Sequence, residues 1–347
     1  MDLGQGEIYF IAERDGSSNT GFIKIGLVRE RDGRDSYDRI KEHQTGNPRS
    51  LELLNVVKTV LVSTVENTLH REYAGRRVSG EWFKLDQPAL ADAVARCRVL
   101  AETYAAHIPA LEAASALEGV EAVQEMLPAT DESRAWQIIY LKAKAGEKLI
   151  DTATKSFQEF LGRLHDTGTD VSHIATIKEL PGSQRFDESV FKERFPDLWQ
   201  QHLLSTTVMG RSSLRVTPLT STSFDNADEL GETRSVAQLL DELQGREKSD
   251  RAALSEMHGN YLQLIGHEAL FDEQIMLASA YLKMLCGKHE GIDGVCKWKR
   301  ATETKEVLDR ASIKDQFDAE FSQCLVAGSP SRRISILRGV GRNLSEA

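Results

Sequence analysis

Alternating apolar and polar positions organise the first 87 residues into a compact mixed unit. Short runs rich in β-branched and aromatic residues, separated by turn-forming residues, are typical of strands joined by a hairpin. Apolar positions at helical spacing, ended by the breaker Thr45-Gly46-Asn47-Pro48, are typical of a helix. In chain order we expect strands at 7–13 and 22–28, a helix at 36–44, a strand at 51–62, a helix at 63–73 and a strand at 81–85.

After this unit the apolar positions recur mainly with helical spacing, for example within 132–165 and 235–286. Two helices in each block predict helical hairpins. We therefore expect an α+β protein, with a small mixed sheet and flanking helices at the N-terminus followed by a mostly helical region. The predicted segments are a first domain at 1–87, a helical connector at 88–130, a helical unit at 131–216, a linker at 217–230 and a second helical unit with a basic tail at 231–347.

The two helical units match each other at an offset near 121 residues, which predicts a tandem repeat. Residues 174–178 match 295–299, and residues 211–216 match 332–336, each in the same order as the neighbouring apolar blocks. Apolar stripes on the long helices would allow one unit to pack against the other, or against a second chain.

Charge and composition exclude several classes of protein. The chain has 43 Lys and Arg against 53 Asp and Glu, a net charge of −10, and nearly all of the excess follows residue 87. This argues against a basic protein that coats nucleic acid, but not against a local site where a divalent cation supplies positive charge. No membrane-length apolar run or secretory signal is evident, and four scattered cysteines favour a reduced, cytoplasmic protein.

Polar residues on the predicted strands and helices of the first domain form a candidate catalytic set. Residues four apart on a helix share one face. The set consists of Tyr9 and Lys24 on the first two strands, Arg39 and His43 on the first helix, and Glu66 on the second helix, four residues before His70.

This set suits phosphodiester hydrolysis. Glu66 can hold a hard divalent cation such as Mg²⁺, and Arg39 can contact phosphate oxygens through its planar guanidinium. Either Tyr9 or His43 can take the proton of an attacking water. Lys24 beside Tyr9 would lower the pKa of the phenol. Taken singly, each residue also fits a structural role, such as a core aromatic, a solvated lysine, or an Arg39 paired with Asp35 or Asp38.

The same residues carry a resemblance to a known family. Glu7-Ile8-Tyr9 and Lys24-Ile25-Gly26 look like the two signature triplets of the GIY-YIG nuclease superfamily. The T5orf172 branch of that superfamily is the one that residues 5–87 resemble. The supporting motifs are Arg39-Ile40 before Gln44-Thr45-Gly46-Asn47-Pro48, Val65-Glu66 with Leu69-His70, and Glu81-Trp82-Phe83.

The resemblance implies a small sheet with flanking helices and metal-dependent cleavage of DNA. By position, Tyr9 would be the base or its partner, Arg39 the phosphate contact, His43 the second helix residue and Glu66 the metal ligand. Lys24 stands where many relatives have the second tyrosine. Glu7 replaces the first glycine, and the Asn that follows the Glu-bearing helix in many members has no clear counterpart.

Candidate DNA contacts outside the first domain are an aromatic residue between cations and a basic strand. They comprise Lys297, Trp298, Lys299, Arg332 and Arg333, for which a core residue and a solvated edge strand are the alternatives.

We therefore expect a DNA endonuclease that uses Mg²⁺, with Mn²⁺ as a substitute, acting in phage defence or mobile-element biology. The helical units would select substrate, bind a protein partner or self-associate, with no membrane involved. The alternatives are an inactive nucleic-acid-binding module and an assembly subunit of a defence complex.

Overall fold

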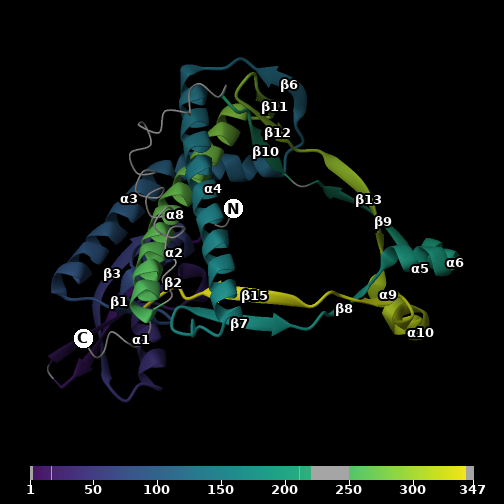
Figure 1. Cartoon of the computed structure of the whole chain (residues 1–347). Coiled ribbons are helices and arrows are strands. Elements are labelled where there is room, and N and C mark those ends of the chain that lie inside the picture. Colours follow the sequence, from purple (N-terminus) through teal and green to yellow (C-terminus); the bar gives the residue numbers. More distant parts are fainter. Residues whose placement is uncertain (1–2, 17, 211, 220–249, 341–347) are drawn as a thin grey trace.

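The N-terminal domain is built on a five-stranded sheet with strand order β3-β1-β2-β5-β4, antiparallel throughout. The structure is a computed structural model that describes residues 3–16, 18–210, 212–219 and 250–340 (Figure 1). The domain's strands are β1 (Gly6–Asp15), β2 (Ser18–Arg29), β3 (Ser50–Thr59), β4 (Arg77–Ser79) and β5 (Trp82–Lys84). Its helices are α1 (Ser36–Gln44) and α2 (Val62–Glu72), with 3-10 turns at Glu30–Asp32 and Ala74–Arg76.

The pleat of β1 separates two cores. Ile8 and Phe10 face α2 and the following helix α3 (Gln87–Glu118), where they form the main hydrophobic core. Tyr9 and Ile11 face the opposite side, toward Ile40 of α1. Alternate side chains of a strand point to opposite faces, so this arrangement follows from the period-two pattern of residues 7–13. The predicted α+β class and the order of the first strands and helices are confirmed, with β4 as an addition.

Two long helices form the spine of the rest of the molecule. α4 (Asp131–Asp166) and α8 (Arg251–Cys286) pack along each other, and α8 also packs on α2 and α3 (Figure 1). Leu277 and Ala280 of α8 are part of the same core as Ile8 and Phe10. The helical hairpin predicted for the first unit is therefore wrong, because its long helix pairs with a helix of the other unit. The hairpin predicted for the second unit falls partly on residues 231–249, which lie outside the described residues.

Strands after each long helix pair with strands of the other unit. The elements after α4 are β7 (Ala175–Leu180), β8 (Gln184–Phe186), α5 (Glu188–Arg194), α6 (Pro196–Gln201), β9 (Leu203–Met209) and β10 (Ser213–Val216). Those after α8 are β11 (His289–Ile292), β12 (Cys296–Lys299), β13 (Thr302–Leu308), α9 (Arg310–Gln316), α10 (Asp318–Ser322), β14 (Leu325–Ala327) and β15 (Ser331–Ile336). Three antiparallel ribbons join the units, β7 with β15, β8 with β14 and β9 with β13.

A fourth cross-pairing lies within a small sheet of order β10-β12-β11-β6, whose edge strand β6 (Val123–Leu127) comes from the connector. The ribbons run from the spine to a distal lobe of short helices, so the chain outlines a ring in Figure 1. Stacked Phe186 and Phe321, with ring centroids 4.3 Å apart, lie in the core of that lobe.

The segments 174–178 and 295–299 both contain a strand, β7 and β12 respectively. The elements also follow a similar order after α4 and α8. Homology of the two units stays a prediction, as do the domain boundaries. Residues 220–230 of the linker, 231–249 of the second unit and 341–347 of the basic tail lie outside the described residues.

All four cysteines are free and buried. Among the described residues, no helix combines the length and the apolar character that crossing a bilayer requires.

Candidate active site

Tyr9 and His43 are brought together by the packing of α1 on β1. Tyr9 is fully buried, and its hydroxyl lies 3.2 Å from His43 Nε2. Burial raises the pKa of Tyr9 to about 12, while the nearby charge of Arg39 acts in the opposite direction. Burial also lowers the pKa of His43, with the charges of Lys24 and Arg39 acting in the same direction. At neutral pH the pair is therefore a phenol beside an uncharged imidazole.

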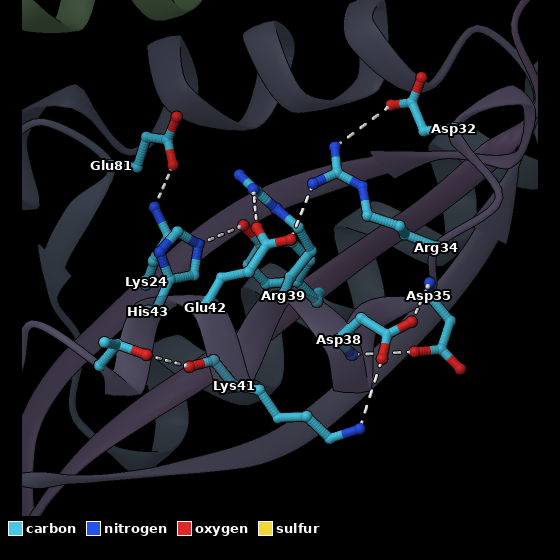
Figure 2. A network of polar contacts seen from close by, with 12 residues as sticks. Lys24, Asp32, Arg34, Asp35, Asp38, Arg39, Lys41, Glu42, His43 and Glu81 are labelled. Carbon is cyan, nitrogen blue, oxygen red and sulfur yellow. Dashed lines mark hydrogen bonds and ion pairs between the residues drawn. The ribbon is translucent and has the colours of Figure 1, made fainter.

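The prediction that Lys24 lowers the pKa of Tyr9 is wrong. Lys24 does lie on the same sheet face as Tyr9, because Tyr9 pairs with Gly26 and Ile11 pairs with Lys24. However, the ammonium of Lys24 makes an ion pair with Glu81 (Figure 2), and Arg39 is the cation that acts on the phenol.

The structure explains one residue in each signature triplet, Gly26 in the second and Glu7 in the first. A Cβ at Gly26 would lie 2.4 Å from the hydroxyl oxygen of Tyr9, so only glycine leaves room for the phenol. Glu7 replaces the usual glycine and caps α1, because its carboxylate accepts from the Ser36 backbone N–H at 3.2 Å and the Ser36 hydroxyl at 2.7 Å. The departure at residue 7 therefore fixes the helix that carries Arg39 and His43.

Arg39 is held at the surface of the same helix. Its Nη1 donates to Glu42 Oε2 at 2.5 Å, and Arg34 donates to the other oxygen of Glu42 at 2.7 Å (Figure 2). Asp35 and Asp38 instead form the capping box of α1, so the structural alternative for Arg39, an ion pair with either of them, is not found. The side chain of Arg39 keeps 28% of its surface exposed, which leaves the guanidinium accessible to a phosphate.

Glu66 lies on α2 and is partly buried. Burial raises its pKa to about 7, and the charge of Glu81 raises it further, whereas Lys24, Arg29 and Arg77 lower it. Glu66 also acts on the pKa of Tyr9, which places the carboxylate within electrostatic range of the phenol.

Glu81 is a site residue that the sequence reasoning used only as part of a motif. It lies in the turn between β4 and β5, where β5 pairs with β2 and places Trp82 opposite Lys24. Burial alone would raise its pKa, but the hydrogen bond and charge of Lys24 bring the pKa below its usual value. The signal that could have found it is the position of an acid directly before a strand that pairs with the Lys24 strand.

His70 has a positioning role behind the site. Its Nε2 lies 2.9 Å from the carbonyl oxygen of Ile25, and its ring packs on Phe83 with centroids 5.2 Å apart. It is buried, and burial lowers its pKa. His70 thereby fixes α2, and with it Glu66, against β2.

The match with known families agrees with this geometry. Residues 6–98 match the model of the T5orf172 domain. This segment is a T5orf172 domain of the GIY-YIG-like nuclease superfamily. The recognition proposed for residues 5–87 is therefore confirmed, and it covers about a quarter of the chain. No curated protein and no solved structure matches the chain.

The candidate metal site of the T5orf172 domain depends on few protein ligands. Among the described residues, no group of three or more His, Cys, Asp or Glu side chains is arranged to hold a metal ion. Glu66 has the carboxylate of Glu81 within electrostatic range, and these two are the candidate carboxylate ligands on this face. Mg²⁺ suits such a site, because it retains several waters and commonly uses one or two carboxylates together with substrate phosphate oxygens.

The candidate DNA contacts outside the T5orf172 domain differ in exposure. Lys297 and Arg333 are exposed. Lys299 and Arg332 are exposed but paired, Lys299 with Glu303 and Arg332 with Asp166 and Glu179. Trp298 is fully buried, with Arg300 stacked 3.7 Å from its ring centroid and Ser212 accepting from its Nε1–H at 2.8 Å. The stacking role predicted for Trp298 does not fit this burial, and the core role does.

Proposed function

We propose that the T5orf172 domain is the catalytic head of a metal-dependent DNA endonuclease that hydrolyses phosphodiester bonds. The observation that carries the proposal is the convergence of Tyr9, His43, Arg39 and Glu66 from two helices and a strand. A proton-transfer pair, a phosphate-binding cation and a carboxylate metal ligand are the groups that such hydrolysis needs.

The acidic groups of the site fit a divalent cation. The negative charge of Glu81 makes ionisation of Glu66 less favourable, which contributes to the raised pKa of Glu66. A Mg²⁺ or Mn²⁺ ion held by Glu66, with Glu81 as a second carboxylate, would neutralise the repulsion between the two carboxylates. When bound, the cation polarises a phosphoryl oxygen and stabilises the leaving oxygen.

The remaining residues have separable roles in the proposed reaction. Arg39 binds a non-bridging phosphate oxygen, which fixes the phosphodiester relative to Tyr9. The attacking water gives its proton to the Tyr9–His43 pair, in which the uncharged His43 is the group able to gain charge. Lys24 acts as a positioning residue, because its ion pair holds Glu81 beside Glu66.

The experiment that tests the proposal is nicking of supercoiled plasmid with Mg²⁺ or EDTA. We expect cleavage by the wild type in Mg²⁺, none in EDTA and none by Glu66→Ala, whereas the matched control Glu159→Ala on the exposed face of α4 retains wild-type activity. DNA binding without cleavage by the wild type would favour the inactive binding module instead. A setting in phage defence or mobile-element biology, and a cytoplasmic location, are further parts of the proposal.

A further inference from the structure

A pocket of about 330 Å³ lies next to the catalytic face, between the T5orf172 domain and the helical region. The domain contributes His70, Arg71 and Arg77 to its wall, and the helical region contributes Glu268 of α8 and Arg338. His70 lies one turn after Glu66 on α2, and Glu66 lies within electrostatic range of Arg77, so the pocket is close to the proposed metal site.

Arg338 is held at this pocket by backbone contacts on both sides. Before it, the Leu337 N–H donates to the Ile174 carbonyl at 2.8 Å, and the Leu337 carbonyl lies 2.7 Å from His258 Nε2. After it, the Val340 N–H donates to the Arg77 carbonyl at 2.9 Å.

Gly339 allows this close approach to the T5orf172 domain. A Cβ at Gly339 would lie 2.7 Å from the Arg77 carbonyl oxygen, closer than real Cβ contacts. The segment that carries Arg338 thus packs against Arg77, the first residue of β4. These backbone contacts hold Arg338 close to Arg77.

The charges around the pocket leave two guanidinium groups available. Arg71 is balanced by Asp272 at 2.6 Å and Glu268 at 3.6 Å. Within the described part of the chain, Arg77 and Arg338 have no carboxylate at ion-pair distance, although Glu66 and Glu81 lie within electrostatic range of Arg77. The Nε–H of Arg77 donates to the Gly80 carbonyl, so its two Nη groups are the donors left for a ligand. Two like charges facing one pocket repel each other, and an anion between them removes that cost.

We propose that Arg77 and Arg338 form a phosphate subsite that binds the DNA backbone next to the scissile phosphodiester. The inference rests on the proposed function, because it takes DNA as the substrate of Glu66 and Arg39. Planar guanidinium groups pair with the oxygens of a phosphate or a carboxylate through two parallel hydrogen bonds, and DNA, as the proposed substrate, supplies phosphates. The helical region then completes the DNA-binding surface of the T5orf172 domain through one residue far along the chain.

The test measures binding of the full chain to a short duplex DNA in EDTA, where no cleavage occurs, across a range of salt concentrations. We expect Arg338→Ala to weaken affinity about three- to tenfold and to reduce the slope of log Kd against log salt by about one contact. Arg338→Lys should retain most of that slope. Arg185→Ala removes an exposed arginine of β8 in the distal part of the ring and should change neither quantity.

Equal effects of Arg338→Ala and Arg185→Ala, or an unchanged slope for Arg338→Ala, would overturn the subsite. Because Arg338 is exposed, we expect Arg338→Ala to keep the wild-type melting temperature, which is measured on the same samples. Failure of the proposed function has a different signature. In that case the wild type does not cleave in Mg²⁺, while the salt dependence still separates Arg338→Ala from its control.

Discussion

The hydroxyl of Tyr9 lies 3.2 Å from Nε2 of His43, a contact between the first strand and the first helix. The contact joins a phenol whose pKa is raised to about 12 to an imidazole whose pKa is lowered by burial. The two proton-transfer candidates that the sequence left as alternatives are therefore a single hydrogen-bonded pair.

Arg39→Ala should slow cleavage by about 10²–10³ because it removes a charge-assisted contact to the phosphate in the transition state. Single-turnover rates on plasmid DNA measure the effect. The matched control is Arg49→Ala, which removes an exposed arginine that pairs with Glu13. A loss of similar size in the control would argue against a phosphate contact at Arg39.

His43→Ala should slow cleavage less than Arg39→Ala, because the variant keeps the Tyr9 hydroxyl of the proton-transfer pair. The same single-turnover assay gives the comparison. If His43→Ala is the more damaging change, the water passes its proton directly to His43, and Tyr9 only orients the imidazole.

Glu66→Gln should abolish cleavage and at the same time stabilise the metal-free protein at pH 8. Folding raises the pKa of this carboxyl from 4.5 to about 7, so Glu66 lowers the free energy of unfolding progressively between pH 4.5 and 7, and the full loss is present at pH 8. After allowance for partial exposure, the gain is about 1–3 kcal/mol. Denaturant unfolding in EDTA at pH 8 measures it, and a destabilised Glu66→Gln would contradict the assigned burial effect.

Glu81→Gln should increase the Mg²⁺ concentration required for half-maximal cleavage, because one of two carboxylates near the cation is lost. The control is Glu52→Gln, which alters an ion pair with Arg14 on the other edge of the domain. An unchanged Mg²⁺ requirement for Glu81→Gln would leave Glu66 as the sole carboxylate ligand.

His258 should make stability fall as the pH is lowered through 6.5. Burial lowers its pKa in the folded protein, so below 6.5 the unfolded chain binds a proton that the folded protein does not. The contribution of neutral His258 to the free energy of unfolding is fully present above pH 6.5. Below pH 6.5 it falls by up to about 1.4 kcal/mol per pH unit until the pH reaches the lower pKa of the folded protein. Chemical denaturation from pH 7.5 to 5 should give a steeper decline for the wild type than for His258→Gln, and parallel declines would exclude this role.

The local patterns of the first domain predicted most of its secondary structure and which polar side chains share a face. Period-two alternation placed Tyr9 and Lys24 on one sheet face, and four-residue spacing placed Arg39 and His43 on one helix face. These relationships depend on short stretches of chain. The role of Glu81 depends instead on which strand pairs with β2, which no local pattern specifies.

The helical region shows the same limit more strongly. The helical spacing of 132–165 predicted a helix correctly, but apolar stripes do not specify whether the partner helix is adjacent in sequence or more than a hundred residues away. Trp298 illustrates the ambiguity for side chains, since an aromatic between cations has the same local sequence whether it is exposed or stacked on a buried Arg300.

The exchange of strands between the two units also sets an order of events during synthesis. Among the described strands β7 pairs with β15 alone, so the ribosome must have translated beyond residue 336 before β7 can form its ribbon. At ordinary elongation rates this delay is on the order of ten seconds, during which the strand edges of β7, β8 and β9 remain unpaired. We therefore expect the ring to close last and slowly, as pairings of high contact order do. Its unpaired edges would make nascent chains that stop before β15 prone to aggregation.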